Sequence, residues 1–571
     1  MTSRLRSFSS RLLGALALCL GGSTAGLLTL SCEELTCVDL LTCEGSAGAP
    51  SQSGGSAGKD PAGGRSGGGS GGRSTGGVGG QGGEPSGGTG GSESEEDPGL
   101  ALSAPAIVRV RQGEKVRVPL RVERKGRLQG ELTVSAIDLP SGIVADPVTV
   151  LEDDGEEVMF DLAAKAAAEQ THRRTLHLRV TGPDGLEDEV KVRLVVAGPP
   201  GSLDKSFGGG GFVKVSSTLT GVTVASDETI WAAGNQDSGP LRVYHFDHDG
   251  TPNWNIETKG RYSGSLGSQG ERVFIRFSGL GEENGDYLMA FALEGTVDET
   301  FGNKGTLLLG LNMQNADLPI QLLPDGSGLA MNTERTVRFG PDGSDLSGFK
   351  FFYEPPTIMD RVTASAFDSK GRIWVSWRTN DSQRYFVQRA RADGRLDTSF
   401  GESGVAQSLS GVPSEAVAQT METQRIVVRP DDSAILFATS SPNVQRIDIF
   451  ENEVALLSFS SNGELDEEFG IDGKVIVGNS FTALSAFRST AGDIIVGYIP
   501  GYTGEPRLVR YDDRGERDEQ FGEDGEINLA HLFPMGETLA QYPDFAHESA
   551  TGRVIVVISS SASAYLASYW L

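Results

Sequence analysis

A short acidic motif, Gly-x-Leu-Asp-x-x-Phe-Gly-x-x-Gly, recurs along this chain and is the first candidate for chemistry. Its strong copies read GSLDKSFGGGG from Gly201, GTVDETFGNKG from Gly295, GRLDTSFGESG from Gly394, GELDEEFGIDG from Gly463 and GERDEQFGEDG from Gly515. The motif carboxylates are Asp204, Asp298, Asp397, Asp466 and Asp518. A carboxylate in such a loop can bind a metal ion, or it can accept a backbone N–H two residues on and close an Asx turn. We expect the structural role, because a site of chemistry is seldom copied identically around a ring.

The motif also carries one phenylalanine and several glycines. The phenylalanines are Phe207, Phe301, Phe400, Phe469 and Phe521. A phenylalanine side chain buries a large apolar area, and its removal from a core costs about 3–5 kcal/mol. We therefore expect these side chains to fill the seam between neighbouring repeat units. We expect the glycines to supply positive φ angles where two strands connect.

No other group of residues has the pattern of a catalytic or metal centre. The histidines form no HExxH or His-x-His pair, so a transition-metal site lacks its usual ligands. Asp247-x-Asp249-Gly250 resembles the start of a calcium loop but lacks the glutamate at position twelve, and we interpret it as a turn. The GxSxG patterns lie in a glycine-rich tract without the strand and helix of a hydrolase site. We therefore expect no catalytic residue, no metal and no cofactor.

The repeats define the elements that position these residues. The strong copies, with weaker ones at Gly250 and Gly343, divide the chain beyond residue 200 into seven units of about 50 residues. Each unit has an alternating apolar run before the motif, such as LRVYHF or VALLSFS, and an earlier apolar run, such as TIWAAG or DIIVGY. A further short run follows the motif, as in GFVKVSS. Four strands in each of seven units predict an all-β fold with a seven-bladed β-propeller over residues 199–571.

The motif resembles the delta-60 repeat, a tandem repeat of bacterial surface and secreted proteins. The resemblance covers roughly residues 201–571 and depends on the strong copies in constant register. The copies at Gly250 and Gly343 depart from it, because they lack the Asp and the Phe-Gly pair or keep only part. The resemblance implies a repeat architecture and an exported or surface location. It implies no catalytic residue.

The first 31 residues have the pattern of an export signal. Arg4, Arg6 and Arg11 precede the apolar run Leu12–Leu20. The sequence LTLSC that ends at Cys32 resembles a bacterial lipobox, although Thr29 stands where the usual pattern has leucine. Ordinary cleavage before Gly26 is the alternative.

Cysteine counting favours lipidation of Cys32. The chain has four cysteines, of which Cys19 leaves with the signal. A lipid on Cys32 leaves Cys37 and Cys43 to form a disulfide in an oxidising compartment. A cysteine metal cluster is the alternative, but no histidine lies nearby. We predict an exported protein, an outer-membrane lipoprotein facing the periplasm or the surface, or otherwise a secreted protein.

Two further segments separate this anchor from the propeller. Residues 32–98 are predicted to hold the anchor, the remaining cysteines and a disordered Gly/Ser-rich linker, since residues 44–98 contain 22 glycines and no aromatic side chain. Residues 99–198 are predicted to form an immunoglobulin-like β-sandwich. Its expected strands are 107–111, 115–122, 131–137, 148–151, 157–162, 175–180 and 189–196.

Composition narrows the possible functions. A net charge of −28 disfavours nucleic acid and anionic lipid surfaces as partners, so a membrane is reached only through the lipid anchor. We predict a monomeric, non-catalytic binding or structural protein of the cell envelope, with a protein or glycan partner. The alternative is a propeller enzyme, a glycan lyase or glycosidase, that uses the central funnel. We expect an insertion in the longest unit, near Ser408–Arg425 or Ser440–Asn452, to contribute to the partner surface.

Overall fold

The computed structural model describes the two β-rich parts of the chain. The described residues are 98–126, 128–235, 240–258, 260–279, 285–310, 320–331, 336–346, 359–379, 385–406, 420–441, 453–501, 504–533, 539–548, 551–560 and 563–571. The predicted signal, linker, lipidated Cys32 and disulfide Cys37–Cys43 lie outside these residues. Within them, no helix is long and apolar enough to cross a membrane.

Residues 99–197 form two β-sheets. One has the strand order β1-β3-β7-β5 and the other β2-β9-β8-β4-β6. The pairs are antiparallel except for β2 and β9, which run parallel. Every strand expected from the sequence is present, and β1 and β5 are additional. The strands are β1 (Gly99–Ser103), β2 (Ile107–Arg111), β3 (Lys115–Lys125), β4 (Leu132–Ile137), β5 (Ile143–Ala145), β6 (Val148–Val150), β7 (Glu157–Ala164), β8 (Thr171–Thr181) and β9 (Glu187–Ala197), with the short 3₁₀ helix η1 (Pro183–Gly185) between β8 and β9.

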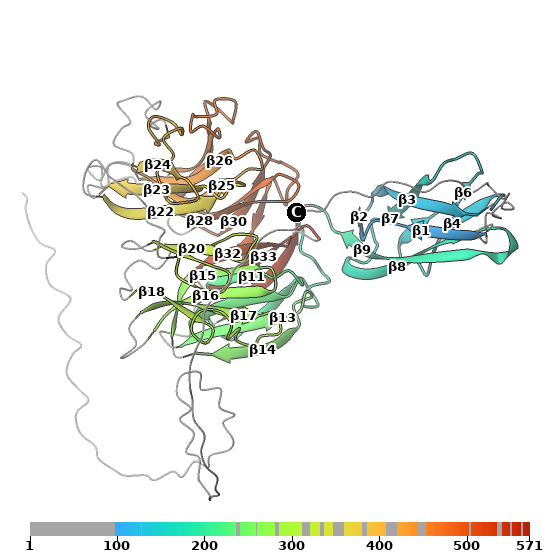
Figure 1. Ribbon diagram of the computed structural model, residues 1–571, viewed down its shortest axis with the longest axis horizontal. Helices are drawn as coiled ribbons and strands as arrows, with labels where there is room; N and C mark the ends of the chain where they lie inside the picture. The colour runs from blue at the N-terminus through green and yellow to red at the C-terminus, as the bar shows by residue number, and fades with distance from the viewer. Residues whose placement is uncertain are drawn as a thin grey trace, which may run out of the picture. The chain divides into compact units, whose positions relative to one another are not determined.

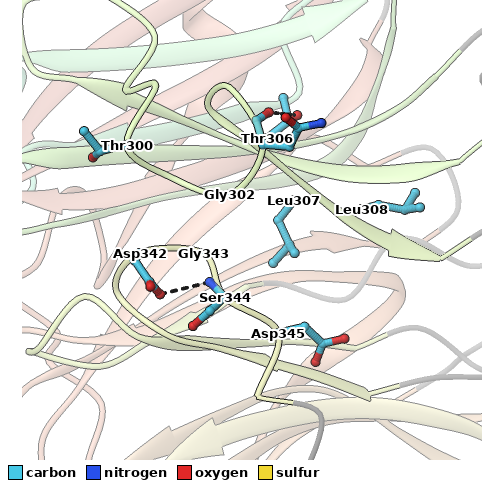
Figure 2. A pocket seen from close by; sticks show the side chains of 10 residues that line it. Thr300, Gly302, Thr306, Leu307, Leu308, Asp342, Gly343, Ser344 and Asp345 are labelled. Atoms are coloured by element: carbon cyan, nitrogen blue, oxygen red, sulfur yellow. Dashed lines mark hydrogen bonds between the residues drawn. The ribbon is translucent and has the colours of Figure 1, made fainter. Parts of the chain in front are cut away.

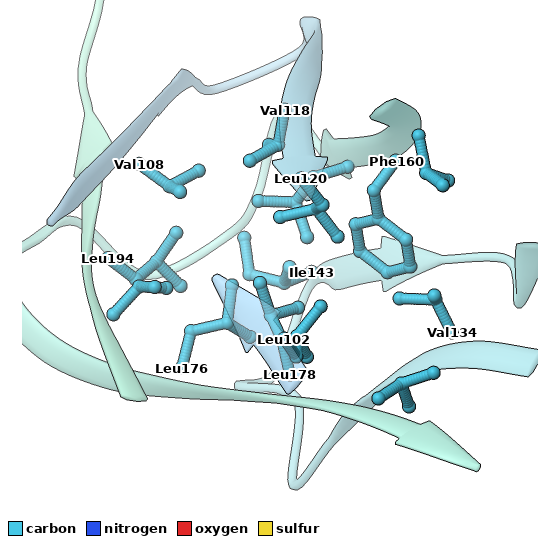
Figure 3. Close-up of a cluster of buried hydrophobic side chains, with 14 of the residues drawn as sticks. Leu102, Val108, Val118, Leu120, Val134, Ile143, Phe160, Leu176, Leu178 and Leu194 are labelled. Atoms are coloured by element: carbon cyan, nitrogen blue, oxygen red, sulfur yellow. The ribbon is translucent and has the colours of Figure 1, made fainter. Parts of the chain in front are cut away.

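The two sheets share one apolar core, which follows from the alternation of their strands. In β3, Val118 and Leu120 are buried while the residues between and beside them are exposed. Phe160 of β7 and Leu178 of β8 are fully buried. Figure 3 shows these side chains directed into the same interior from both sheets. No cysteine occurs after residue 43, so this core is held by packing alone.

Residues 201–571 form antiparallel sheets in a propeller-like arrangement, in which five sheets correspond to one repeat unit each and one continuous sheet spans two units. The strand orders are β32-β33-β34-β10, β11-β12-β13-β14, β15-β16-β17-β18, β19-β20-β21, β22-β23-β24 and a continuous β25 to β31. In the last of these, β28 pairs with β27 through its first half and with β29 through its second, so one strand serves two units. Two units show three strands within the described residues, where the sequence predicts four.

In chain order, strand β10 (Phe212–Val215), which belongs to the sheet of β32–β34, is followed by the strands of three units: β11 (Gly221–Val224), β12 (Ile230–Asn235), β13 (Leu241–Phe246), β14 (Pro252–Glu257), β15 (Arg261–Gln269), β16 (Arg272–Ser278), β17 (Asp286–Ala292), β18 (Thr306–Gly310), β19 (Gln321–Leu322), β20 (Gly328–Met331) and β21 (Thr336–Phe339). The later strands are β22 (Met359–Phe367), β23 (Ile373–Thr379), β24 (Tyr385–Ala390), β25 (Thr420–Val428), β26 (Ala434–Ser441), β27 (Glu453–Phe459), β28 (Lys474–Arg488), β29 (Ile494–Pro500), β30 (Arg507–Tyr511), β31 (Glu526–Asn528), β32 (Leu539–Glu548), β33 (Arg553–Ser560) and β34 (Ala564–Trp570), with the 3₁₀ helix η4 (Leu529–Leu532) between β31 and β32.

Burial on both faces explains the most apolar strand of each unit. Every residue of β33 and of β34 is buried. A strand that packs against neighbouring sheets on both faces needs a continuous apolar run and cannot alternate with polar residues. The runs TIWAAG and RVIVVIS are therefore middle strands, and they form the core between units.

The two ends of the repeat region meet in one sheet. Strand β10, which follows the first motif, pairs with β34 at the end of the chain. The N–H of Asp204 donates to the carbonyl of Ser568 at 2.8 Å, so the first motif completes the unit that the last residues begin. The first strand of the first complete unit, β11, also contacts β32 and β33. Figure 1 shows green β11 beside red β33, from opposite ends of the region.

The motif connects each unit to the next through one backbone hydrogen bond and one aromatic contact. The glycine after the motif phenylalanine donates its N–H to the residue before the next leading glycine: Gly208 to Asp249 (2.7 Å), Gly302 to Asp342 (2.8 Å), Gly401 to Asn462 (2.6 Å), Gly470 to Arg514 (2.8 Å) and Gly522 to Pro200 (3.0 Å). The motif phenylalanine packs under that next glycine. A Cβ atom on Gly463 would lie 2.8 Å from the Phe400 ring. We call this pair of contacts the seam latch.

Glycine is required at the leading position for two reasons. The leading glycines have φ between +73° and +97°, as the sequence predicts. The latch also leaves no room for a side chain. In the unit that begins at Gly250, the motif phenylalanine is absent and Trp254 takes its place, since a Cβ on Gly295 would lie 2.1 Å from the Trp254 ring.

Two glycine substitutions can distinguish the packing contact of the seam latch from backbone strain at positive φ. Gly463→Ala meets the Phe400 ring at a φ of +83°, whereas Gly371→Ala has a φ of +70° and its nearest neighbour at 3.9 Å. Both variants incur strain, but Gly463→Ala also overpacks the seam. We expect it to lower the free energy of unfolding by about 1–3 kcal/mol more than Gly371→Ala, measured by urea unfolding. Equal losses would show that the latch is not tightly packed.

Candidate functional site

The motif aspartates accept hydrogen bonds from their own loops. In the loops that begin at Gly201, Gly295, Gly394 and Gly515, Oδ1 of the aspartate accepts the backbone N–H two residues on: Asp204 from Ser206 (3.0 Å), Asp298 from Thr300 (3.0 Å), Asp397 from Ser399 (3.3 Å) and Asp518 from Gln520 (2.9 Å). This is the geometry of an Asx turn. Asp466 differs, because its Oδ2 accepts the hydroxyl of Ser458 at 2.9 Å.

Each motif aspartate also forms an ion pair with an arginine, which the sequence reasoning missed. The pairs are Asp204 with Arg553 (2.8 Å), Asp298 with Arg272 (2.6 Å), Asp397 with Arg389 (2.8 Å), Asp466 with Arg429 (3.7 Å) and Asp518 with Arg510. Asp204 and Arg553 are both fully buried. A buried carboxylate needs such a counter-charge, because its desolvation would otherwise be very costly.

The arginine comes from different strands in different units, which hides it in the sequence. In two units it lies five residues before the leading glycine, as Arg389 and Arg510. Ala290 stands at that position in another unit, and Ser568 takes the equivalent place beside the first motif; there the arginine instead begins the preceding middle strand, as Arg272 and Arg553 do. The unit with Ser458 uses Arg429, just after β25. A search for a fixed spacing between Asp and Arg could not find all of these pairs.

The arginines also lie over the motif phenylalanines. The guanidinium carbon is 4.6 Å from the ring centroid between Arg389 and Phe400, and 5.0 Å between Arg510 and Phe521. Burial alone would raise the pKa of Asp397, but the Ser399 hydroxyl and the Arg389 guanidinium hold that pKa below its ordinary value. The Asp397 carboxylate is therefore ionised and engaged within the protein.

These contacts argue against metal loops at the motif. The carboxylate oxygens are taken by N–H, hydroxyl and guanidinium groups, and all the motif phenylalanines are buried beside them. Among the described residues, no group of three or more His, Cys, Asp or Glu side chains is placed to hold a metal ion. His245 is buried, and its ring stacks on Trp254 at 4.8 Å, which is a packing role.

An open pocket of about 540 Å³ lies at the seam between the units of β15–β18 and β19–β21. It is formed by the motif loop that begins at Gly295 and by the loop around Gly343, which the Gly302 latch holds together. We call it the seam pocket. Figure 2 shows Leu307 directed toward the loop that carries Asp342 and Asp345. The polar lining side chains are Thr300, Asn303, Thr306, Asp342, Ser344 and Asp345.

The seam pocket offers groups that can form hydrogen bonds, including the carboxylates of Asp342 and Asp345. Asp342 is exposed, and its Oδ1 accepts the Ser344 N–H at 3.0 Å. The hydrogen bonds from the Ser344 side chain and backbone lower the pKa of Asp342, so this carboxylate is charged at neutral pH. Leu308 is 44% exposed at the rim and supplies an apolar surface. Hydroxyl, amide and carboxylate groups beside one apolar side chain are the groups that recognise a polyhydroxylated ligand.

Part of the range predicted for the insertion forms a strand. The candidate ranges Ser408–Arg425 and Ser440–Asn452 lie mostly outside the described residues, but 420–425 belong to β25, the first strand of its sheet. Those residues therefore belong to a regular sheet. Their regular alternation is interrupted by a bulge, which conceals the strand in the sequence.

Comparisons with known proteins give the chain no family. No family model matches it, and no curated protein matches it, so the delta-60 repeat remains a resemblance carried by the motif copies. The solved structures that it resembles include prolyl oligopeptidase B from Galerina marginata, at 10% identity and a TM-score of 0.35, over 60% of this chain and 47% of that one. The chain thus spans about half of that protein.

Two further structures match at lower scores. A triple arginine mutant of AofleA from Arthrobotrys oligospora is 10% identical with a TM-score of 0.23, over 71% of this chain and 93% of that one. Domains 4–9 of the surface layer protein SbsC are 10% identical with a TM-score of 0.13, over 83% of this chain and 82% of that one. Similarity at these scores carries no functional argument. The fold assignment therefore stands on the sheets and their contacts.

Removal of a motif carboxylate should expose the cost of an unpaired buried arginine. Arg389 and Asp397 are 3% and 6% exposed, so Asp397→Asn leaves a buried cation. We expect a loss of about 3–5 kcal/mol in unfolding free energy at pH 7. Asp393→Asn, at an exposed turn, should change it by less than about 0.5 kcal/mol.

The difference in unfolding free energy between the wild type and Asp397→Asn should decrease as the pH falls. Because the folded pKa of Asp397 is lowered, its stabilisation is present above the unfolded value of about 3.9 and is lost as pH falls through the folded value. Urea unfolding of the wild type and of Asp397→Asn should therefore converge in acid. A gap that stays constant down to acid pH would contradict an ionised, paired Asp397.

Proposed function

We propose that this chain is an exported, non-catalytic binding protein of the cell envelope that presents a closed seven-bladed β-propeller to a glycan or protein partner. The observation that carries this proposal is the seam pocket, an open and polar surface held between two latched loops. The carboxylates of the motif aspartates are engaged in ion pairs, so binding is left to the other polar groups at the seam.

The chemistry of the seam pocket favours a glycan over a peptide. Its volume of about 540 Å³ suits one or two sugar units. Its lining offers hydroxyl groups from Thr300 and Thr306, the amide of Asn303 and the carboxylate of Asp342. Sugars present closely spaced hydroxyl groups, which such acceptors and donors can satisfy together.

The remaining segments fit the same proposal. Lipid on Cys32 would hold the protein at a membrane, and the glycine-rich linker would let the folded part reach outward. By the ordinary scaling for flexible linkers, residues 44–98 would span roughly 40 Å. The sandwich, in this proposal an immunoglobulin-like module, would act as a spacer or adhesion module. The net charge of −28 would limit unspecific attraction to anionic surfaces.

The alternative is a glycan lyase or glycosidase in the central funnel. A glycosidase of the usual kind needs two carboxyl groups on either side of the scissile bond. Retention of an intact glycan supports the binding protein, whereas a shortened product supports the enzyme. One binding experiment can therefore distinguish the two functions.

Two aspartates in equivalent turns provide the test. Asp342 and Asp393 each precede a leading glycine, and each accepts the N–H two residues on at 3.0 Å, but only Asp342 lines the seam pocket. Asparagine keeps that acceptor in both turns. We expect Asp342→Asn to weaken glycan binding about tenfold and Asp393→Asn to leave it unchanged.

The purified full chain would be applied to an array of bacterial envelope oligosaccharides, and each glycan would be examined for cleavage by mass spectrometry. Saturable binding that Asp342→Asn weakens selectively supports the proposal. Binding that both variants retain in full would place the partner surface elsewhere. Cleavage of a bound glycan would replace the binding protein by the enzyme.

A further inference from the structure

The first strand of each unit contacts the first strands of the neighbouring units, and we call these the inner strands. Five of them contain β-bulges, and in β15, β25 and β32 a bulge borders a tyrosine, an arginine or an aspartate. The register shifts between Tyr262 and Leu266 in β15, between Thr423 and Arg425 in β25, and between Gln541 and Asp544 in β32. Bulges re-aim side chains and are frequent beside binding sites. We call Tyr262, Arg425 and Asp544 the inner-strand cluster.

Tyr262 and Asp544 meet at the same point of β11. The hydroxyl oxygen of Tyr262 occupies the space above Gly221, where a Cβ atom would lie 1.9 Å from it. The next residue, Val222, donates its N–H to Asp544 Oδ2 at 3.0 Å. The Tyr262 backbone is fixed by Asn235, whose Oδ1 accepts the Tyr262 N–H at 2.7 Å. Two polar groups from distant parts of the chain are thus held side by side.

The hydroxyl of Tyr262 is buried without a hydrogen-bond partner. The residue is 7% exposed, and its oxygen makes no hydrogen bond within the described part of the chain. Burial, with the nearby Asp544 carboxyl, raises the pKa of Tyr262 well above its ordinary value, so the phenol keeps its proton. A buried hydroxyl that keeps its proton and has no acceptor costs free energy unless a ligand supplies one.

Arg425 of β25 supplies the positive charge of the inner-strand cluster. Its guanidinium is half-buried and makes no hydrogen bond or ion pair among the described residues, in contrast to the arginines that pair with the motif aspartates. Its charge acts on the other two members of the cluster. Burial raises the pKa of Asp544 and of Tyr262, and the Arg425 charge opposes both rises. The three groups therefore form one electrostatic unit built from three separate blades.

We propose that the inner-strand cluster binds a small carboxylate that carries a neighbouring hydroxyl group. The ligand carboxylate accepts hydrogen bonds from the Arg425 guanidinium and the Tyr262 hydroxyl, and the ligand hydroxyl donates to Asp544. Arginine suits a carboxylate because its planar fork can donate two parallel hydrogen bonds. The site is separate from the seam pocket and does not depend on the function proposed for it.

Such a carboxylate can be a free hydroxy acid or a uronic acid residue of a glycan. D-Glycerate and D-glucuronate represent the two sources, and D-glucose matches the glucuronate ring without its charge. Binding to the purified full chain would be measured by titration calorimetry and by the rise in thermal midpoint. We expect saturable binding of D-glucuronate, of D-glycerate or of both, and none of D-glucose.

Variants locate the site. We expect Arg425→Gln to weaken binding at least tenfold, and Tyr262→Phe and Asp544→Asn each to weaken it several-fold. Arg391→Gln, at an exposed position, is the control and should bind as the wild type does. The Tyr262→Phe change removes one oxygen and keeps the ring, so it tests the contact even if Arg425→Gln does not fold.

The results can identify the source of the carboxylate, and they can also show that the site does not exist. Tighter binding of D-glucuronate indicates a glycan residue, and tighter binding of D-glycerate indicates a free hydroxy acid. If the wild type shows neither heat nor a midpoint shift with both carboxylates, the site does not exist. Binding that Tyr262→Phe and Arg425→Gln leave at the wild-type value would equally overturn the assignment.

Discussion

The seam latch is the contact on which the repeat region depends. A single N–H from the glycine after each motif phenylalanine reaches the carbonyl before the next leading glycine, and the phenylalanine packs under that glycine. Neither contact tolerates a side chain at the leading position. The latch from Gly522 to Pro200 joins the last motif to the first, so the same short-range rule that connects neighbours also closes the array. Five repetitions of one local contact thereby produce long-range order.

The ion pairs beside the latch explain why acidic residues recur without a repeated active site. Each motif aspartate is held by an arginine, and several of these arginines lie over the motif phenylalanine. A buried pair contributes little net stability, but loss of one partner is costly, so the pair ties the motif loop to one conformation. The seam pocket lies between two of these latched loops, and the inner-strand cluster lies at bulges in three strands.

Sequence periodicity predicted the repeat units, most strands and the positive φ of the leading glycines, because these features follow from local alternation and turn chemistry. It could not predict the arginine partners, since Arg389, Arg272 and Arg429 occupy three different places in their units. Trp254 was overlooked as a latch residue because it stands four residues after its leading glycine, whereas the motif phenylalanines stand six residues after theirs. Arg425 and Asp544 were missed because bulges interrupt the alternation of β25 and β32. What escaped prediction depends on which strands become neighbours in space.

Amide hydrogen exchange tests the latch most directly. The five latch amides, those of Gly208, Gly302, Gly401, Gly470 and Gly522, lie in surface loops but donate to a neighbouring unit. Exchange of an amide that is locked between units requires those units to separate. These amides should therefore exchange as slowly as those of the buried strand β33. Exchange at the rate of an open loop, above all at Gly522, would contradict a ring held together by its seams.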